Sequence, residues 1–475
     1  MNLIAYDIGL LIIFVIFVTL FLYKNKKNLK KEGLLYIYRT SWGMKIIDKI
    51  GQKYKKTLKF LSYVSITIGY ALMAGMIYMV GKIVYVYVAY PAIVQELKVP
   101  PIMPLLPYMP QAFQLDFLPP FYFSYFIIIL AVIAIPHEFA HGIFMRRYGI
   151  NIKSTGFGFF PFFFPIFLAA FVEQDEKDME KKSSFKQMSV LSAGTFANII
   201  ITIIGFILMA LFFILAFSPA GVEFDSYAYT VTGLSAINMV NNQTFDNHTY
   251  ESLNNSLEDG LNTVRVNQTE YYLTKDFLDK QRNAQDYVLV YYKAPAIENN
   301  ISNVITSING ETIKSMDKMN SVLDPYNPGD EINVTLARGE NNDRITYKEK
   351  LVLGENPINN SEPWLGIAFQ KQNQGAMGKL ISFFNFKKPY VNYQPNFGAG
   401  VFIYQLLWWV VLASFSVALV NMLPVGIFDG GRFFYLTIFS LTKSEKKAAN
   451  WFKFSTNLIL FILVLLMVFW VIGIL

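Results

Sequence analysis

The chain has 475 residues and a formal net charge of +7 at pH 7; 53% of its residues are hydrophobic and 16% are charged. Length alone would allow about three soluble domains, but this composition excludes an ordinary soluble protein and favours a multispanning membrane protein. The sequence has no cysteine, which excludes disulfide bonds, cysteine-ligated zinc and thiol chemistry. Any bound metal would therefore be held by histidine, aspartate or glutamate.

Apolar runs long enough to cross a bilayer, which takes about 20 helical residues, occur six times. In chain order they lie near 4–22, 60–88, 121–145, 189–217, 398–423 and 455–475. The first run is expected to remain as an anchor, because its basic cluster follows the apolar stretch and no small-residue cleavage site closes it. We therefore expect about six transmembrane helices.

Lysine and arginine are concentrated between the first two runs, where residues 24–60 carry twelve of them, whereas 89–120 carries a single lysine. Such residues mark cytoplasmic loops. The segments 24–60, 146–188 and 443–447 are thus predicted to face the cytoplasm, and 218–397 and both termini the outside. The positive charge is accounted for by the inner leaflet of the bilayer, so no nucleic-acid partner is expected.

The third run contains HEFAH, residues 137–141, and with it two of the three histidines of the chain. An ionisable group near the middle of a span costs about 2.5–3.5 kcal/mol on insertion scales, so Glu138 indicates a functional site. Helical residues four apart share one face, so His137 and His141 can bind one zinc ion. Glu138 can take a proton from the attacking water and pass it to the leaving amine.

Residues 154–173, STGFGFFPFFFPIFLAAFVE, are almost entirely apolar, yet Gly156, Gly158, Pro161 and Pro165 make a straight helix unfavourable. A lone strand exposed to lipid would leave its backbone groups unpaired. The segment is therefore predicted to be a re-entrant β-hairpin sheltered by protein. A simple buried hairpin with no binding role is the alternative.

Between about 220 and 370 the sequence becomes polar and Asn-rich, which predicts a soluble extracytoplasmic domain. Its local signals are β-runs at 287–292, 303–308 and 332–337, a helix near 315–324, and hairpin turn signals at Asn309-Gly310 and Pro328-Gly329-Asp330. This order resembles the second half of PDZ domains over about 285–353. The resemblance implies a peptide ligand beside a sheet edge, with a ligand-free spacer as the alternative; 220–284 matches no pattern that we can place.

A zinc site of this kind needs a third protein ligand and an open fourth position. His248 lies in the outer region, so the ligand is expected to be an acid at matching depth on another span. Asp429 qualifies, because it follows the fifth run at its cytoplasmic end, where the third run also ends. Pro424 and Gly426 would interrupt the helix and leave Asn421 to line a cavity. Taken alone, Asp429 could equally be a helix N-cap.

Taken together, HEFAH, SAGTFANI at 192–199 and NMLPVGIFDG at 421–430 resemble the site-2 protease family of intramembrane zinc metalloproteases. The likeness covers about 121–440 and implies a Zn²⁺ cofactor and a hairpin that offers its edge to substrate. It implies a general base, Glu138, three zinc ligands, His137, His141 and Asp429, and two polar groups near the substrate or the oxyanion, Asn198 and Asn421.

The predicted fold class is a polytopic α-helical membrane protein with a re-entrant β-hairpin and an α+β PDZ-like soluble domain. Its segments are two N-terminal spans with a basic inner and a Pro-rich outer loop (1–120), core spans with HExxH (121–217), the outer domain (218–378) and C-terminal spans with the aspartate (379–475).

The predicted function is cleavage of membrane-spanning segments of substrate proteins near the cytoplasmic face by a zinc endopeptidase, with membrane-protein substrates and the lipid bilayer as partners. Two other classes stay open: a non-catalytic PDZ-bearing membrane scaffold, and an HExxH membrane peptidase that acts outside the bilayer. A transporter with an intramembrane proton relay is a weaker third possibility.

Overall fold

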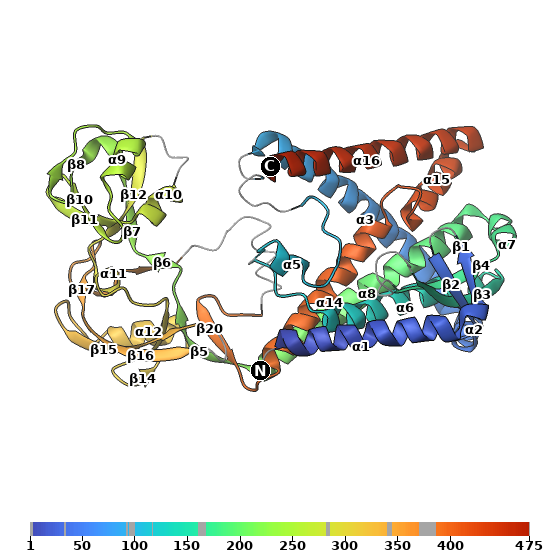
Figure 1. Cartoon of the computed structure of the whole chain (residues 1–475), viewed down its shortest axis with the longest axis horizontal. Helices are drawn as coiled ribbons and strands as arrows, with labels where there is room; N and C mark the ends of the chain where they lie inside the picture. Colours follow the sequence, from blue (N-terminus) through green and yellow to red (C-terminus); the bar gives the residue numbers. More distant parts are fainter. Residues whose placement is uncertain are drawn as a thin grey trace. The chain divides into compact units, whose positions relative to one another are not determined.

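The computed structural model describes residues 3–32, 35–91, 94, 100–115, 117–159, 168–281, 286–339, 344–369 and 386–474. The chain forms two compact units, one of Met1–Phe212 with Val401–Leu475 and one of Phe213–Gly400. The first unit is built mainly of helices and the second mainly of β-strands (Figure 1).

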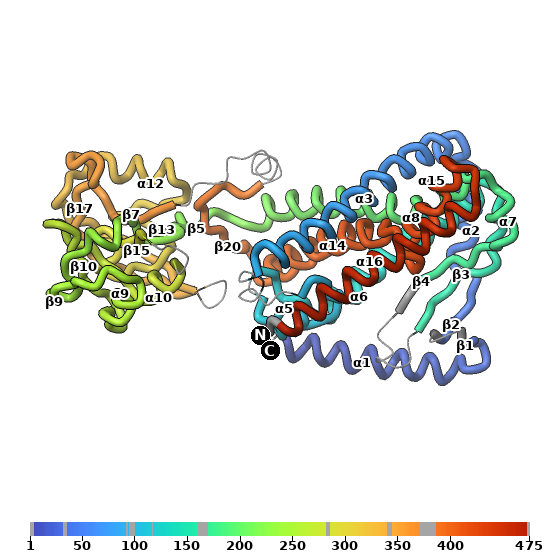
Figure 2. Tube along the Cα trace, turned by 90° about the horizontal axis from the view of Figure 1, so that it is seen from above, coloured from blue at the N-terminus to red at the C-terminus, as the bar shows by residue number. Residues whose placement is uncertain are grey.

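Within the described residues, six helices are long and apolar enough to cross a membrane, as the sequence predicted. They are α1 (Leu3–Lys24), α3 (Lys55–Ala89), α6 (Phe123–Arg147), α8 (Ser184–Ala216), α14 (Gly400–Asn421) and α16 (Glu445–Ile474). The first and last described residues lie at the same end of these helices in both views (Figures 1 and 2). An even number of spans requires this arrangement.

Short helices join the long ones in the first unit. They are η1 (Lys26–Asn28), α2 (Met44–Lys53), α5 (Met109–Ala112), α7 (Glu176–Glu180) and α15 (Asp429–Thr442). The helix is interrupted between Asn421 and Asp429, as Pro424 and Gly426 predicted. Phe428 occupies the N-cap position of α15 and Asp429 is the first helical residue, so the N-cap interpretation of Asp429 was wrong.

A core of apolar side chains holds the helices of the first unit together. Its buried members come mainly from α2, α3, α6, α8, α14 and α15, and include Ile47, Leu72, Phe144, Val190 and Phe433. Polar side chains within it are paired: Ser192 donates to Ser65 over 3.1 Å, and the hydroxyls of Ser62 and Tyr148 lie 2.7 Å apart. This core supports the faces of α6, α8 and α15 that carry the candidate site.

The first unit also contains a four-stranded antiparallel sheet with the order β1-β2-β3-β4. Its strands are β1 (Leu29–Glu32), β2 (Leu35–Thr40), β3 (Ile152–Phe159) and β4 (Leu168–Gln174). β3 and β4 pair where the sequence predicted a hairpin, and the residues between them lie outside the described part of the chain. Gly156 lets β2 and β3 approach, because a Cβ there would collide with the Tyr38 carbonyl oxygen. Sequence analysis did not foresee β1 and β2.

The second unit contains two six-stranded antiparallel sheets, each with its own apolar core, in the orders β7-β12-β11-β10-β8-β9 and β16-β15-β13-β5-β20, with β14 beside β13. Two short ladders, β17-β18 and β19-β6, complete it. The strands are β5 (Phe217–Glu223), β6 (Ser226–Tyr227), β7 (Tyr229–Gly233), β8 (Ile237–Val240), β9 (Gln243–Thr244), β10 (Asn262–Val266), β11 (Thr269–Leu273), β12 (Tyr287–Tyr292), β13 (Val304–Ile308), β14 (Glu311–Thr312), β15 (Glu331–Arg338), β16 (Ile345–Val352), β17 (Gly354–Glu355), β18 (Pro363–Trp364), β19 (Ile367–Ala368) and β20 (Val391–Pro395). The helices are η2 (Leu234–Ala236), α9 (Tyr250–Ser256), α10 (Lys275–Asp279), α11 (Pro295–Glu298) and α12 (Met316–Leu323).

The local predictions for this unit are largely confirmed. The three β-runs are β12, β13 and β15, and the helix predicted near 315–324 is α12. Asn309 and Gly310 have φ of 48° and 84° and join β13 to β14 as a hairpin. The segment 328–330 was wrongly taken for a hairpin turn, since it connects α12 to β15. The region that matched no pattern, 220–284, supplies most strands of the first sheet.

Candidate metal centre

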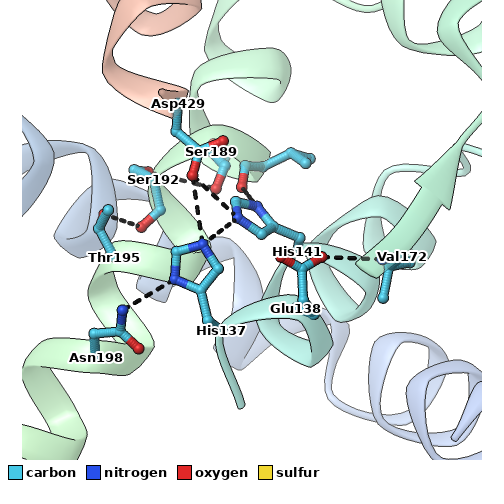
Figure 3. A network of polar contacts seen from close by, with 10 residues as sticks. His137, Glu138, His141, Val172, Ser189, Ser192, Thr195, Asn198 and Asp429 are labelled. Carbon is cyan, nitrogen blue, oxygen red and sulfur yellow. Dashed lines mark hydrogen bonds and ion pairs between the residues drawn. The ribbon is translucent and has the colours of Figure 1, made fainter. Parts of the chain in front are cut away.

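His137 and His141 lie one turn apart on α6 and point into the protein, with exposed fractions of 8% and 7%. The spacing of four residues places both rings on one helix face. Their Nε2 atoms are 3.1 Å apart (Figure 3). Two ring nitrogens therefore converge on one point in a helix that is apolar enough to cross a membrane.

Asp429, at the start of α15, completes this cluster from 288 or more residues further along the chain. Its Oδ2 atom lies 3.5 Å from Nε2 of His137 and 3.3 Å from Nε2 of His141. A tetrahedral zinc ion with bonds of about 2.05 Å sets its ligand atoms about 3.3 Å from one another. The structure thus brings together the three predicted ligands at the separation that one such ion requires.

The hydrogen bonding of His141 tests whether these residues suit a cation. Its Nδ1 lies 2.7 Å from the carbonyl oxygen of Val190, which can only accept. Nδ1 therefore carries the proton, and in the neutral ring Nε2 presents a lone pair to the cluster. A lone pair and a carboxylate oxygen directed at one point repel each other unless a cation lies between them. The two-nitrogen, one-oxygen donor set fits zinc.

Glu138 lies beside the three donor atoms without belonging to the cluster that could hold a metal. One oxygen of its carboxylate accepts a hydrogen bond of 3.0 Å from the backbone N–H of Val172 on β4 (Figure 3). This bond connects the carboxylate of the HExxH helix to the strand of the hairpin. Glu138 is thereby held beside the three candidate metal ligands, where a general base would be needed.

Two cavities meet at the cluster, and each is lined in part by His137, Glu138 and Asp429. The first, of about 350 Å³, is otherwise mostly apolar, with Asn421 among its lining residues. The second, of about 480 Å³, also contains charged side chains: Arg39, Lys153, Glu173 and Glu176. Arg39 and Ser154 both donate hydrogen bonds to the Glu173 carboxylate, 2.9 and 2.6 Å long. The site therefore borders both an apolar and a polar space.

Comparison with known proteins also indicates a metallopeptidase. The model of peptidase family M50 matches residues 125–466, which is most of the chain. The chain belongs to peptidase family M50, the site-2 protease family. An uncharacterized protein of Methanocaldococcus jannaschii is 23% identical to it over 440 residues, which cover 90% of this chain and 85% of the relative. The family membership and the apolar helices together identify the chain as a multi-pass membrane metallopeptidase.

In this M50 peptidase the remaining predicted site residues occupy different places. Asn421, the last residue of α14, lines the apolar cavity with Glu138 and Asp429. Asn198 on α8 is fully buried, and its amide lies 3.1 Å from Nδ1 of His137, on the side of the ring away from Asp429 (Figure 3). Its observed contact is thus with a histidine of the cluster.

Sequence analysis of the M50 peptidase missed two groups on α8 that touch the histidines. One is the Val190 carbonyl oxygen. The other is Gly194, whose Cα hydrogen faces the ring nitrogens. A backbone carbonyl leaves no mark in a sequence, but the spacing of 190, 194 and 198 by four residues within SVLSAGTFAN was a readable signal of a shared helix face.

Proposed function

We propose that this M50 peptidase is a zinc-dependent intramembrane endopeptidase that cleaves membrane-spanning segments of other proteins near the cytoplasmic face. The observation that carries the proposal is the convergence of two imidazoles and a remote carboxylate at 3.1–3.5 Å. It occurs beside a second acid, Glu138, on a helix apolar enough to span a membrane. Zinc at this cluster would polarise the scissile carbonyl and the attacking water.

The protein's own residues would then handle the proton and the developing charge. Glu138 takes the proton of the attacking water and passes it to the leaving amine; the N–H of Val172 holds its carboxylate in place. The Asn421 amide lines the same cavity and can donate a hydrogen bond to the oxyanion. Asp429 and both histidines would hold the ion.

The substrate is proposed to bind as an added strand of the four-stranded sheet. A transmembrane helix must first unwind, because its peptide carbonyls are hydrogen-bonded and shielded within the helix. On β3, the side away from β4 is already paired with β2, whereas β4 has no second neighbour among the described residues. Strand addition to β4 would bring a peptide alongside Val172 and therefore toward Glu138. The hairpin would be re-entrant in the membrane.

The second unit is proposed to be extracytoplasmic and PDZ-like over about 285–353, with a peptide as its ligand. The strand, hairpin, helix and strand that the PDZ resemblance requires occur in the expected order as β13, β14, α12 and β15. A module of this kind would select or tether substrates by their exposed ends. Placing it outside the membrane rests on the lysine distribution of the loops.

The test compares zinc content with cleavage of a reporter that contains a transmembrane segment, in the purified full-length protein. Glu138→Gln should abolish cleavage and keep the zinc, because the base is lost and the ligands remain. Asp429→Ala should lower the zinc content. The exposed Glu445, at the start of α16, provides a matched control as Glu445→Gln. Turnover by Glu138→Gln, or full zinc loading of Asp429→Ala, would refute the assigned roles.

A further inference from the structure

Helix α8 presents three residues to the HExxH helix at intervals of four: Val190, Gly194 and Asn198. The Val190 carbonyl oxygen lies 2.7 Å from Nδ1 of His141, and the Asn198 amide lies 3.1 Å from Nδ1 of His137. Two residues eight apart on α8 therefore contact, in reverse order, two histidines four apart on α6. Each ring is held at the nitrogen that does not face Asp429.

Gly194 lies between these two contacts and directly against the metal-facing edges of the rings. A Cβ at this position would be 2.5 Å from Nε2 of His137 and similarly close to Nε2 of His141. Carbon and nitrogen in van der Waals contact need more than about 3 Å. Any side chain at 194 would consequently push the rings apart or occupy the place where their lone pairs meet.

Asn198 is fully buried, and its Oδ1 has no hydrogen-bond partner in the described part of the chain while Nδ2 faces His137. The two ends of a carboxamide have the same size, so either end can make this contact. A histidine that binds a metal through Nε2 carries its proton on Nδ1. That proton needs an acceptor, and only Oδ1 can accept.

We propose that this stripe of α8 (Val190, Gly194 and Asn198) forms the second layer of the metal centre. Val190 and Asn198 accept the Nδ1 protons, which leaves both Nε2 lone pairs for the ion, and Gly194 leaves room for it. Asn198 and Gly194 are thus positioning residues that act through the ligands, in place of the substrate or oxyanion role that the family resemblance implies for Asn198. The inference rests on the proposed function only for the presence of a divalent cation.

A pair of variants at Asn198 tests whether its side chain accepts a hydrogen bond from His137 or donates one to it. Asn198→Asp keeps an acceptor and loses the donor, whereas Asn198→Leu keeps the volume and loses both. Zinc affinity, measured on full-length protein by competition with a chromophoric chelator, should fall 10- to 100-fold in Asn198→Leu and stay within about threefold in Asn198→Asp. The visible absorption spectrum of bound Co²⁺ should still be that of a tetrahedral site in Asn198→Asp. Equal loss in both variants would overturn the proposal.

Gly194→Ala tests the close approach, and Gly205→Ala on the same helix is its matched control. A Cβ at Gly205 would meet only side chains, the nearest being Val411 at 3.2 Å. Gly194→Ala should lose at least tenfold in zinc affinity while its helical circular dichroism matches that of Gly205→Ala. Wild-type affinity in Gly194→Ala would contradict the proposal. If Gly194→Ala does not fold, the Asn198 pair decides.

The tests of the second layer can fail or succeed independently of the test of the proposed peptidase function. A protein whose zinc affinity depends on Asn198 and Gly194 in this way, but which cleaves no membrane segment, supports the second layer and refutes the peptidase. A wild-type chain without zinc affinity refutes both.

Discussion

Two glycines that follow Asp429 bring its carboxylate to the histidines. A Cβ at Gly430 would lie 2.5 Å from the carbonyl oxygens of Met422 and Leu423, and one at Gly431 would lie 2.7 Å from the carbonyl carbon of Val425. These neighbours are backbone atoms of the interruption between α14 and α15, so they cannot rotate away as a side chain can. The first turn of α15 therefore rests directly on that backbone.

Gly430→Ala should accordingly displace Asp429 and weaken metal binding. A shift of the carboxylate by a few tenths of an ångström stretches one ligand bond, and we expect zinc affinity to fall at least tenfold, or about 1.4 kcal/mol. Competition with a chelator measures the change. Gly426→Ala is the control, because its nearest neighbour is a side-chain atom, Cζ of Phe452, at 3.2 Å. Equal affinities in the two variants would argue against this role for Gly430.

Some of these residues could be identified from sequence and others could not. His137, Glu138 and His141 could be identified because they have the HExxH spacing and lie within an apolar run. Asp429 could be identified because it lies at a matching depth at the end of another apolar run. Gly194 could not be assigned, because a missing side chain matters only when the distance to the neighbouring helix is known. The contact partner of Asn198 is set by the packing of α8 on α6, which no local pattern encodes.

Helix α1 contributes to the HExxH helix through one buried acid. Asp7 on α1 is 7% exposed and accepts hydrogen bonds from the backbone N–H groups of Phe123 and Ser124, 2.7 and 2.9 Å long. Tyr108 donates a third, of 2.5 Å. The α6 helix forms no side-chain cap of its own. A residue of another span thus satisfies the first N–H groups of the helix that carries the site.

Asp7→Ala should therefore destabilise the protein more than an ordinary substitution in a span. Loss of a helix cap costs about 1–2 kcal/mol, and burial leaves the released N–H groups without water. We expect a lower midpoint of thermal unfolding in detergent than for Thr19→Ala, which removes a hydrogen bond confined to α1. Matching midpoints would show that α1 does not hold α6 in this way.

The four-stranded sheet shows where element prediction from sequence stops. The hairpin β3–β4 was foreseen because its glycines and prolines exclude a helix in an apolar segment. The segment that forms β1 and β2 is rich in lysine and was interpreted only as a cytoplasmic loop. Its pairing with β3 joins residues more than 110 positions apart, such as Tyr38 and Phe157. Long-range strand pairing of this kind leaves no period in the local sequence.

The orientation of the chain in the membrane affects every span and both units. Residues 24–60, which join the first two spans, carry twelve lysine and arginine residues, and loops with such an excess stay in the cytoplasm. If this loop faced outward instead, the direction of every span would be reversed. The cavity with charged side chains would then face the outside, and the second unit would lie in the cytoplasm.

The absence of cysteine allows a direct test of this orientation. Single cysteines introduced as Lys53→Cys, in the basic loop, and Asn267→Cys, in the second unit, replace side chains that are both exposed. A membrane-impermeant maleimide should label Asn267→Cys in intact cells and Lys53→Cys only after lysis, while the unmodified chain stays unlabelled in both conditions. The reverse pattern would place the cluster of His137, His141 and Asp429 toward the outer face. Under the proposed function, the cut in a substrate would then lie near the outer face of the membrane instead of the cytoplasmic face.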